Sequence, residues 1–571
     1  MGTSQPPAAL SSPSRVLESL SPTPVLSRLD GPVVQVRDPV LQGVDPSSAA
    51  WAAVSDLDPT TLGPEGYALR IRATPEGGGE AVLAASGEVG LFRARTTFEA
   101  LLTTAGSRAL PALSIRDEPA LPWRGTIEGF YGAPWSHGER LEHLRFLARH
   151  KLNSYAYAPK DDPYHRERWR EPYPAADLAL LAELVEAARA YRVRFTYTIA
   201  PGLSMVYSSP AERALLFAKA QQLWDVGVRS FALLFDDIPP HLQHEEDRAA
   251  FGSEKGDTGA AHGAVCAAFA EGFLAPRGGE RLVMCPTEYA GVETSAYRRR
   301  LAETLPADTL VWWTGSDVVV GSVTRAEIDA AAAAFDRDLL LWDNFPVNDF
   351  DPTRLFLGPL VGRSTDLAGS RLAGVSANPM VQASASQFAL ATVADWAWNP
   401  SAYDPAGSAT RGVRAVAEPL ADALRPLVRA ASAWPPSADR APHVSAELPG
   451  ALAGDPGAIE RLRDALGGLA GLPDAAKGVH GALVDQLRPW LSAAAREAAV
   501  ALEALDLSSE GSPISAEDRA RLTARLDAAA SGAHDVLRTM LGDFTRSVLG
   551  LAPAGPAEAP DPSTAFRPPL D

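Results

Sequence analysis

The chain has 571 residues, of which 46% are hydrophobic and 21% are charged, and its formal net charge is −18. This length exceeds what one hydrophobic core supports and predicts about three or four domains. The negative charge disfavours nucleic acid and anionic lipid as partners, because both require clustered Lys and Arg side chains. No stretch approaches the roughly 18 uninterrupted apolar residues of a membrane-spanning helix, so we expect no membrane segment.

The first 20 residues are rich in Ser, Pro and Ala and are predicted to be disordered. They have neither a basic segment nor an apolar core, so we expect a cytoplasmic protein, or a secreted one if a signal has been trimmed. Cys266 and Cys285 lie in apolar runs and are expected to be buried free thiols. His241 and His244 fit neither common zinc spacing on a helix and are expected in a solvated loop.

Residues 21–119 are predicted to form a small α+β domain. Strand-like runs lie at 33–36, 67–72 and 81–85, and a helical pattern at 88–103. Between the second and third runs, the Gly-rich segment 74–80 reads as a hairpin turn. A phosphate-binding loop is disfavoured there, because a strand follows and no Lys-Ser/Thr pair is present.

Strands and helices alternate over residues 120–405, the predicted catalytic domain. The strand-like runs are 124–130, 154–159, 194–201, 230–237, 281–286, 309–315, 339–344 and 372–379. Amphipathic or Ala-rich helical stretches separate them. Eight such units predict an α/β protein built on a (β/α)8 TIM barrel, with a doubly wound open sheet as the alternative.

Residues 410–550 are almost purely helical in character, with Leu and Ala at three- and four-residue spacing. This pattern predicts an all-α helical bundle, whose apolar stripes are most simply its core. A homo-oligomer formed through this bundle is a further hypothesis. Residues 551–571 form a Pro-rich tail.

Polar and aromatic residues gather at the predicted strand ends, which is where a (β/α)8 barrel carries its functional groups. The candidate site residues are Gly129, Lys160, Asp236, Asp237, Tyr289, Trp342, Asn344, Asp349 and Asn378. Carboxylates and amides bind vicinal hydroxyls, and aromatic faces stack on sugar rings. A carboxylate pair also supplies the acid and base of glycoside hydrolysis, so the pattern predicts a carbohydrate site.

Each of these residues also has a purely structural interpretation. The two adjacent aspartates could cap a helix and charge a loop, Lys160 could lie on the surface, and the two asparagines could be turn residues. Trp312, Trp313 and Trp342 could all be core residues, and for at least one of them we expect this. The joint placement at successive strand ends favours a functional site.

Several motifs together resemble those of glycoside hydrolase family 84. They are Glu128-Gly-Phe-Tyr-Gly132, Tyr157-Ala-Pro-Lys-Asp-Asp162, Leu234-Phe-Asp-Asp-Ile238, Cys285-Pro-Thr-Glu-Tyr289, Trp313-Thr-Gly315 and Trp342-Asp-Asn344 with Asn348-Asp349. That family comprises β-N-acetylglucosaminidases, including protein O-GlcNAc hydrolases. The resemblance covers the barrel in order, whereas the flanking domains resemble those of bacterial members only in architecture.

The resemblance implies a retaining, substrate-assisted mechanism in which the 2-acetamido oxygen of the substrate attacks the anomeric carbon and forms an oxazoline. Asp236 would orient the acetamido N–H, and Asp237 would protonate the leaving oxygen and then activate water. Physical reasoning agrees, because neighbouring carboxylates do not both ionise easily and the one with the raised pKa becomes the acid.

The resemblance also implies the remaining roles. The sugar hydroxyls would be held by Gly129, Lys160, Asp349 and Asn378, and the acetamide pocket would be lined by Tyr289, Trp342 and Asn344. Phe350 stands where an aromatic hydroxyl is common in the family, and Ala290 where other residues are frequent. No cofactor is implied.

The sequence therefore predicts an exo-acting β-N-acetylglucosaminidase whose partner is a glycoprotein or oligosaccharide that carries N-acetylglucosamine (GlcNAc). One alternative is an endo-acting, hyaluronidase-like hydrolase, which the negative net charge disfavours because its substrate is a polyanion. Another is a catalytically silent GlcNAc-binding protein, which the intact Asp236 and Asp237 disfavour.

Overall fold

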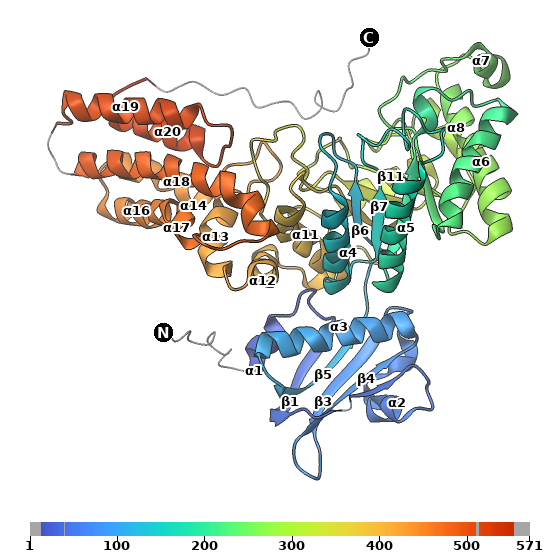
Figure 1. The fold of residues 1–571 in the computed structure, drawn as a ribbon, viewed down its shortest axis with the longest axis horizontal. Helices are drawn as coiled ribbons and strands as arrows, with labels where there is room; N and C mark the ends of the chain where they lie inside the picture. Colours follow the sequence, from blue (N-terminus) through green and yellow to red (C-terminus); the bar gives the residue numbers. More distant parts are fainter. Residues whose placement is uncertain (1–12, 39, 510–512, 553–571) are drawn as a thin grey trace.

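The computed structural model describes residues 13–38, 40–509 and 513–552. Figure 1 shows three parts: an N-terminal sheet with its helices, a central barrel, and a helical region beside the barrel. The barrel contacts both of the other parts. Within the described ranges, no helix combines the length and the apolar character needed to cross a membrane.

The N-terminal part is a five-stranded sheet with the strand order β1-β5-β3-β4-β2. Its strands are β1 (Leu26–Gln35), β2 (Leu41–Gly43), β3 (Tyr67–Ala73), β4 (Gly79–Ala85) and β5 (Ala109–Asp117). The helices α3 (Glu88–Ala105) and α2 (Ala49–Ala53) pack on opposite faces of the sheet. The predicted hairpin is confirmed, since β3 and β4 pair antiparallel across a turn that contains Gly77 and Gly78 in left-handed conformations.

This part differs from the prediction in several features, and strand β2 and helix α2 are among the elements that were not predicted. The segment 1–20, predicted to be disordered, contains helix α1 (Pro13–Glu18), because Val16 and Leu20 are buried in the same core as α3. Residues 1–12 lie outside the described residues. Strand β5 was not predicted, since Pro111 interrupts its apolar run; the strand forms all the same and pairs with both β1 and β3.

The central part is a closed barrel of eight parallel strands, which confirms the predicted fold. Its strands are β6 (Trp123–Glu128), β7 (Ser154–Tyr157), β8 (Arg194–Ile199), β9 (Ser230–Leu234), β10 (Val283–Cys285), β11 (Leu310–Trp313), β12 (Leu339–Asp343) and β13 (Leu372–Ala377). The helices associated with them are α4 (His137–Arg149), α5 (Ala175–Ala190), α6 (Pro210–Asp225), α7 (Glu245–Phe251), α8 (Asp257–Phe269), α9 (Ala296–Thr304), α10 (Arg325–Phe335) and α11 (Ala383–Trp398).

Alternate residues of each barrel strand face inward and outward, as the two-residue period of a strand requires. In β9, Ala232 and Leu234 belong to the inner core, whereas Phe231 and Leu233 pack outward against the helices. In β11, Trp312 faces inward and Trp313 outward, and both are fully buried. These two tryptophans are core residues, as the structural interpretation expected.

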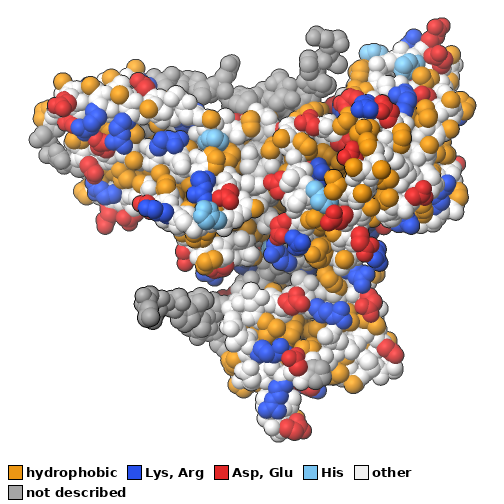
Figure 2. Space-filling view, in the orientation of Figure 1, with side chains coloured by type: hydrophobic (Ala, Val, Ile, Leu, Met, Phe, Trp, Pro, Cys, Tyr) orange, Lys and Arg blue, Asp and Glu red, His pale blue; other side chains and the backbone are white. Residues whose placement is uncertain are grey.

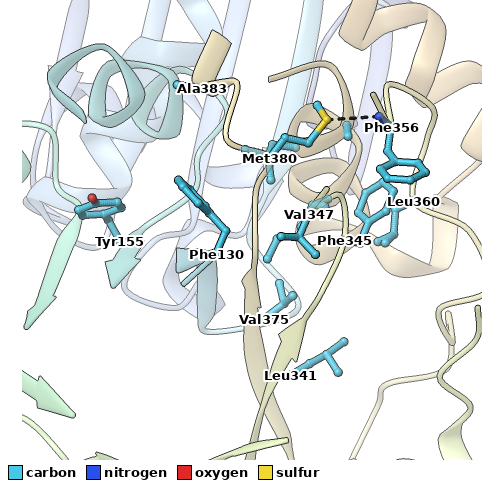
Figure 3. Packing of buried hydrophobic residues seen from close by; sticks show 14 of the residues in the cluster. Phe130, Tyr155, Leu341, Phe345, Val347, Phe356, Leu360, Val375, Met380 and Ala383 are labelled. Atoms are coloured by element: carbon cyan, nitrogen blue, oxygen red, sulfur yellow. Dashed lines mark hydrogen bonds between the residues drawn. The ribbon is translucent and has the colours of Figure 1, made fainter. Parts of the chain in front are cut away.

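The outer core extends from the barrel into the loop after β12. Phe345, Val347 and Phe356 from this loop pack near Met380, and the Phe356 backbone N–H donates to the Met380 Sδ at 3.2 Å (Figure 3). Phe345 and Phe356 also contact the ring of Trp434 in the helical region. The loop that carries Asp349 therefore packs against the barrel near Met380 and against Trp434 of the helical region.

The helical region follows the barrel. Its helices are α12 (Pro405–Ala417), α13 (Ala421–Ala430), α14 (Pro442–Ser445), α15 (Leu448–Leu452), α16 (Pro456–Ala470), α17 (Leu472–Ala475), α18 (Ala482–Ser509), α19 (Ala516–Ala530) and α20 (Arg538–Val548). The long helix α18 contacts α16, α19 and α20. The backbone N–H of Asp535 and the Nε1 of Trp490 both donate to the Thr353 carbonyl in the loop after β12, at 2.9 and 2.8 Å.

A buried ion pair joins the N-terminal sheet to the barrel. The Lys151 Nζ donates to Asp117 Oδ2 at 2.9 Å and to the Tyr67 hydroxyl at 2.8 Å. The other oxygen of Asp117 accepts from Trp398 Nε1, at the end of α11. The side chains of Lys151 and Asp117 are 3% and 0% exposed. Water therefore cannot stabilise either charge if the other one is removed.

Replacing Lys151 with Met is expected to lower the free energy of unfolding by about 3–5 kcal/mol, because the Asp117 carboxylate would stay buried without its cation. Denaturant unfolding at neutral pH measures this loss. The matched control is Arg189→Met, which removes an ion pair with Glu186 whose side chains are 73% and 64% exposed. The control should change stability by less than about 1 kcal/mol, and equal losses in the two variants would contradict the role of burial.

Candidate active site

A pocket opens at the C-terminal mouth of the barrel and encloses about 330 Å³ of empty space, part of which is open solvent. Its lining residues are Gly129, Tyr131, Lys160, Asp236, Asp237, Cys285, Tyr289, Thr314, Val318, Trp342, Asn344 and Asn378.

The strand period explains why polar side chains reach this pocket. Asp236 lies two residues beyond the inward-facing Leu234, and Asn344 lies two residues beyond the inward-facing Trp342. Lys160 stands in the same relation to Ala158. In each of these strands, every second residue still faces inward just beyond the last residue paired with a neighbouring strand. At that level the barrel core ends and the pocket begins.

Asp237 would point outward if the chain stayed extended, yet it also lines the pocket. Its backbone has a φ of 51°, in the left-handed region that Asp tolerates better than most residues. This turn brings the second carboxylate to the same cavity as the first. The adjacent aspartates are therefore neither a helix cap nor a surface charge.

Asp236 is held by a buried ion pair. The Lys160 Nζ donates to its Oδ2 at 2.6 Å, and the two side chains are 3% and 6% exposed. Burial opposes ionisation of Asp236, but Lys160 and Arg166 outweigh it and keep the pKa of this carboxyl below its usual range. The Oδ1 is buried and has no hydrogen-bond partner within the part of the chain that the structure describes. Asp236 is thus an ionised acceptor with one free oxygen.

Asp237 is held by two phenols. The Tyr131 hydroxyl donates to its Oδ2 at 2.8 Å and the Tyr289 hydroxyl to its Oδ1 at 2.9 Å. Burial, together with the neighbouring aspartates, raises the pKa of both phenols above the usual range, so they remain protonated donors at neutral pH. The Lys160 Nζ lies 3.8 Å from Asp237 Oδ2.

An amide network forms the other side of the pocket. The Asn344 Oδ1 accepts from Trp342 Nε1 at 3.0 Å and from Asn378 Nδ2 at 2.9 Å. The Asn378 Oδ1 accepts in turn from the Gly129 N–H at 3.3 Å. Gly129 must be a glycine, since a Cβ there would lie 2.6 Å from the Trp342 ring. The network fixes the face of Trp342 that lines the cavity.

Asp349, the remaining predicted site residue, does not line the pocket and lies half-buried beside it. Its Oδ2 accepts from the Tyr131 N–H at 2.8 Å, and its Oδ1 has no hydrogen-bond partner in the described residues. Burial raises its pKa to about 6. The neighbouring Phe350 is buried and packs on Phe356.

Four pocket residues were not predicted as site residues: Tyr131, Cys285, Thr314 and Val318. The strand alternation could have found Tyr131 and Thr314, which lie two residues beyond Gly129 and Trp312. Cys285 is the last inward-facing residue of β10 and is a buried free thiol. Val318 comes from a loop and carried no signal. Over the described ranges, no group of three or more His, Cys, Asp or Glu residues could hold a metal ion.

Comparison with known proteins identifies the chain. The family model described as beta-N-acetylglucosaminidase matches residues 124–429, more than half of the chain, and that of glycosyl hydrolase family 20, domain 2, matches residues 34–118. Both are models of glycoside hydrolases. The chain belongs to the β-N-acetylglucosaminidase family, glycoside hydrolase family 84.

Individual relatives agree. The protein O-GlcNAcases of Rattus norvegicus and Mus musculus are each 41% identical to this chain over 278 residues, which make up 48% of this chain and 29% of theirs. The chain thus aligns with less than a third of these relatives' length. Among solved structures, CpGH84B has a TM-score of 0.81 at 25% identity and covers 93% of this chain and 99% of its own. A Thermobaculum terrenum O-GlcNAc hydrolase mutant has a TM-score of 0.69 at 29% identity, covering 75% and 94%.

The two phenols on Asp237 make a testable prediction. Replacing either Tyr131 or Tyr289 with Phe is expected to lower kcat/KM for an aryl β-N-acetylglucosaminide by about 10- to 100-fold, because each variant removes one of the two hydrogen bonds that hold the Asp237 carboxyl group in place. Steady-state kinetics at neutral pH measures the loss.

The matched control is Tyr164→Phe, on a half-buried tyrosine that contacts Tyr173 and does not line the pocket. Its kcat/KM should stay within about twofold of wild type. Equal effects at Tyr131, Tyr289 and Tyr164 would contradict a specific role for the two phenols.

Proposed function

We propose that the chain is a retaining exo-β-N-acetylglucosaminidase that removes terminal β-linked GlcNAc by substrate-assisted catalysis. The observation that carries the proposal is the asymmetric treatment of two adjacent carboxylates in one pocket. Asp236 is fixed by a cation and keeps one buried oxygen without a partner, whereas Asp237 is held by two phenols. Different environments give two chemically identical groups different tasks.

In the first step, Asp236 accepts a hydrogen bond from the acetamido N–H of the substrate at its free Oδ1. This bond polarises the amide and directs its oxygen at the anomeric carbon. The new bond from that oxygen to the anomeric carbon forms as the glycosidic bond breaks, and the leaving oxygen takes a proton from Asp237. The products of this step are a free aglycone and a bicyclic oxazoline in its protonated, oxazolinium form, which keeps the N–H proton in the hydrogen bond to Asp236.

In the second step, Asp237 takes a proton from a water molecule, whose oxygen attacks the anomeric carbon from the face that the aglycone left. The oxazoline opens, the acetamide is restored, and the β configuration is retained. The Tyr289 hydroxyl donates its single proton to Asp237 in the free protein, and we assign to it a turn towards the acetamide oxygen when the substrate binds. Trp342 and Asn344 complete the wall around the acetamide.

The remaining polar groups suit a terminal sugar. Lys160, Asn378 and the Gly129 backbone lie around the pocket and are assigned to ring hydroxyls. Asp349 would bind a hydroxyl at the rim through its unpartnered Oδ1. On the face seen in Figure 2, the described Lys and Arg side chains lie among Asp and Glu and form no continuous basic stripe. The net charge of −18 supports a terminal GlcNAc residue over an extended polyanion as the substrate.

Hydrolysis of 4-nitrophenyl β-N-acetylglucosaminide by wild type, Asp236→Asn and Asp237→Asn tests the proposal. Both variants are expected to lose about 10²- to 10⁴-fold in kcat/KM, the range of acid–base and electrostatic effects. With aglycones of lower leaving-group pKa, Asp237→Asn should recover most of its rate of glycosidic cleavage, because it lacks only the acid. Asp236→Asn should not recover.

Asp161→Asn is the matched control, since Asp161 is exposed on the loop beside Lys160 and should leave the rate unchanged. An inactive wild type that still binds GlcNAc would overturn the proposal in favour of a sugar-binding protein. Equal recovery of both variants on good leaving groups would overturn the assignment of the two roles.

A further inference from the structure

Arg166 is a buried cation that lies behind the catalytic pocket and does not line it. Its side chain is 6% exposed, and its Nη2 donates to the backbone carbonyl of Asp237 at 3.4 Å. Its Nη1 is buried and has no hydrogen-bond partner among the residues the structure describes. A buried guanidinium with an unused donor is costly, so a compensating interaction must keep it there.

The loop after β7 presents Arg166 from a fixed position. The Arg166 N–H donates to the Pro163 carbonyl, which closes a turn. The adjacent His165 ties this turn to the end of β8, because its carbonyl accepts from the Ala200 N–H at 2.8 Å and its Nδ1 contacts the Thr198 Oγ1 at 3.2 Å. These hydrogen bonds fix the loop after β7, so the Arg166 guanidinium is held in one position.

The first group that Arg166 acts on is the backbone at Asp237. This residue has the left-handed conformation that turns its carboxylate into the pocket, a conformation that costs an Asp residue free energy. A donor on the carbonyl of that same residue favours this conformation over its alternatives. Arg166 thereby helps to aim Asp237.

The second group is the Asp236 carboxylate, which Arg166 stabilises as the anion, after Lys160. Other titratable groups interact with Asp236 as well: His165, Tyr131, Tyr289 and Cys285, and Asp237 is its neighbour in the chain. Burial lowers the pKa of His165 to about 4 and raises the pKa of the two phenols and the thiol. Between pH 5 and 8 these four groups are neutral, which leaves Lys160 and Arg166 as the cations.

We propose that Arg166 is a positioning residue for the hydrolytic reaction: its hydrogen bond to the Asp237 carbonyl holds the turn that aims the Asp237 carboxylate, and it places a second buried cation next to the two adjacent aspartates. The inference rests on the proposed function, in which ionised Asp236 receives the acetamido N–H. It assigns to the loop after β7 two cations with different tasks, one in the pocket and one behind it.

Three variants separate the two tasks. Arg166→Met loses both, Arg166→Gln keeps a donor without charge, and Arg166→Lys keeps the charge. The readout is the pH dependence of kcat/KM on 4-nitrophenyl β-N-acetylglucosaminide between pH 4 and 9, with thermal unfolding to verify the fold. Arg168→Met is the control, since Arg168 lies on the same loop, 50% exposed, and pairs with Glu171.

Loss of the cation raises the pKa of Asp236, so the acid limb of kcat/KM should move to higher pH in the Met and Gln variants and stay near wild type in the Lys variant. At the optimum, Arg166→Met should lose about 10- to 100-fold, and Arg166→Gln should recover part of this. Wild-type activity with an acid limb that stays unmoved in the Gln variant would overturn the inference while leaving the proposed function intact. If Arg166→Met does not fold, the comparison of Gln with Lys decides. An inactive wild type would instead refute the proposed function itself.

Discussion

The buried ion pair between Lys160 and Asp236 is the interaction on which the site depends. Two opposite charges at 2.6 Å, both almost fully buried, are favourable only while each keeps the other. The pair leaves one oxygen of Asp236 free and orients it, which no solvated carboxylate would achieve. The phenols on Asp237 and the amides on Trp342 are arranged around this fixed charge.

The barrel supplies that arrangement through geometry alone. Along each strand, the inward-facing side chains are small or apolar and fill the barrel core. The residue two positions beyond the last of them lines the pocket. Asp237 is an exception: its left-handed backbone conformation interrupts the inward–outward alternation and brings a second carboxylate into the pocket. A strained backbone at a functional position is expected when the surrounding structure holds it firmly.

Most of the barrel and the site could be predicted from the sequence, because both depend on local patterns. Eight apolar runs with helices between them define the barrel, and polar residues at their ends define the mouth. Helix α1 could not be predicted, since only contacts of Val16 and Leu20 with a distant helix order it. Val318 and Arg166 were missed for the same reason: loop residues acquire their roles from tertiary placement. Asp349 was predicted from its motif, and the structure places it beside the cavity and not on its wall.

The contact of the helical region with the Thr353 carbonyl affects how this enzyme can be dissected. Trp490 and Asp535 donate to a backbone carbonyl only four residues beyond Asp349, so the bundle supports the loop to which we assign a sugar hydroxyl. A fragment that ended after α11 would keep every residue of the pocket wall and lose that support. We therefore expect the minimal catalytic unit to be larger than the barrel, because the helical region holds a loop beside the pocket in place.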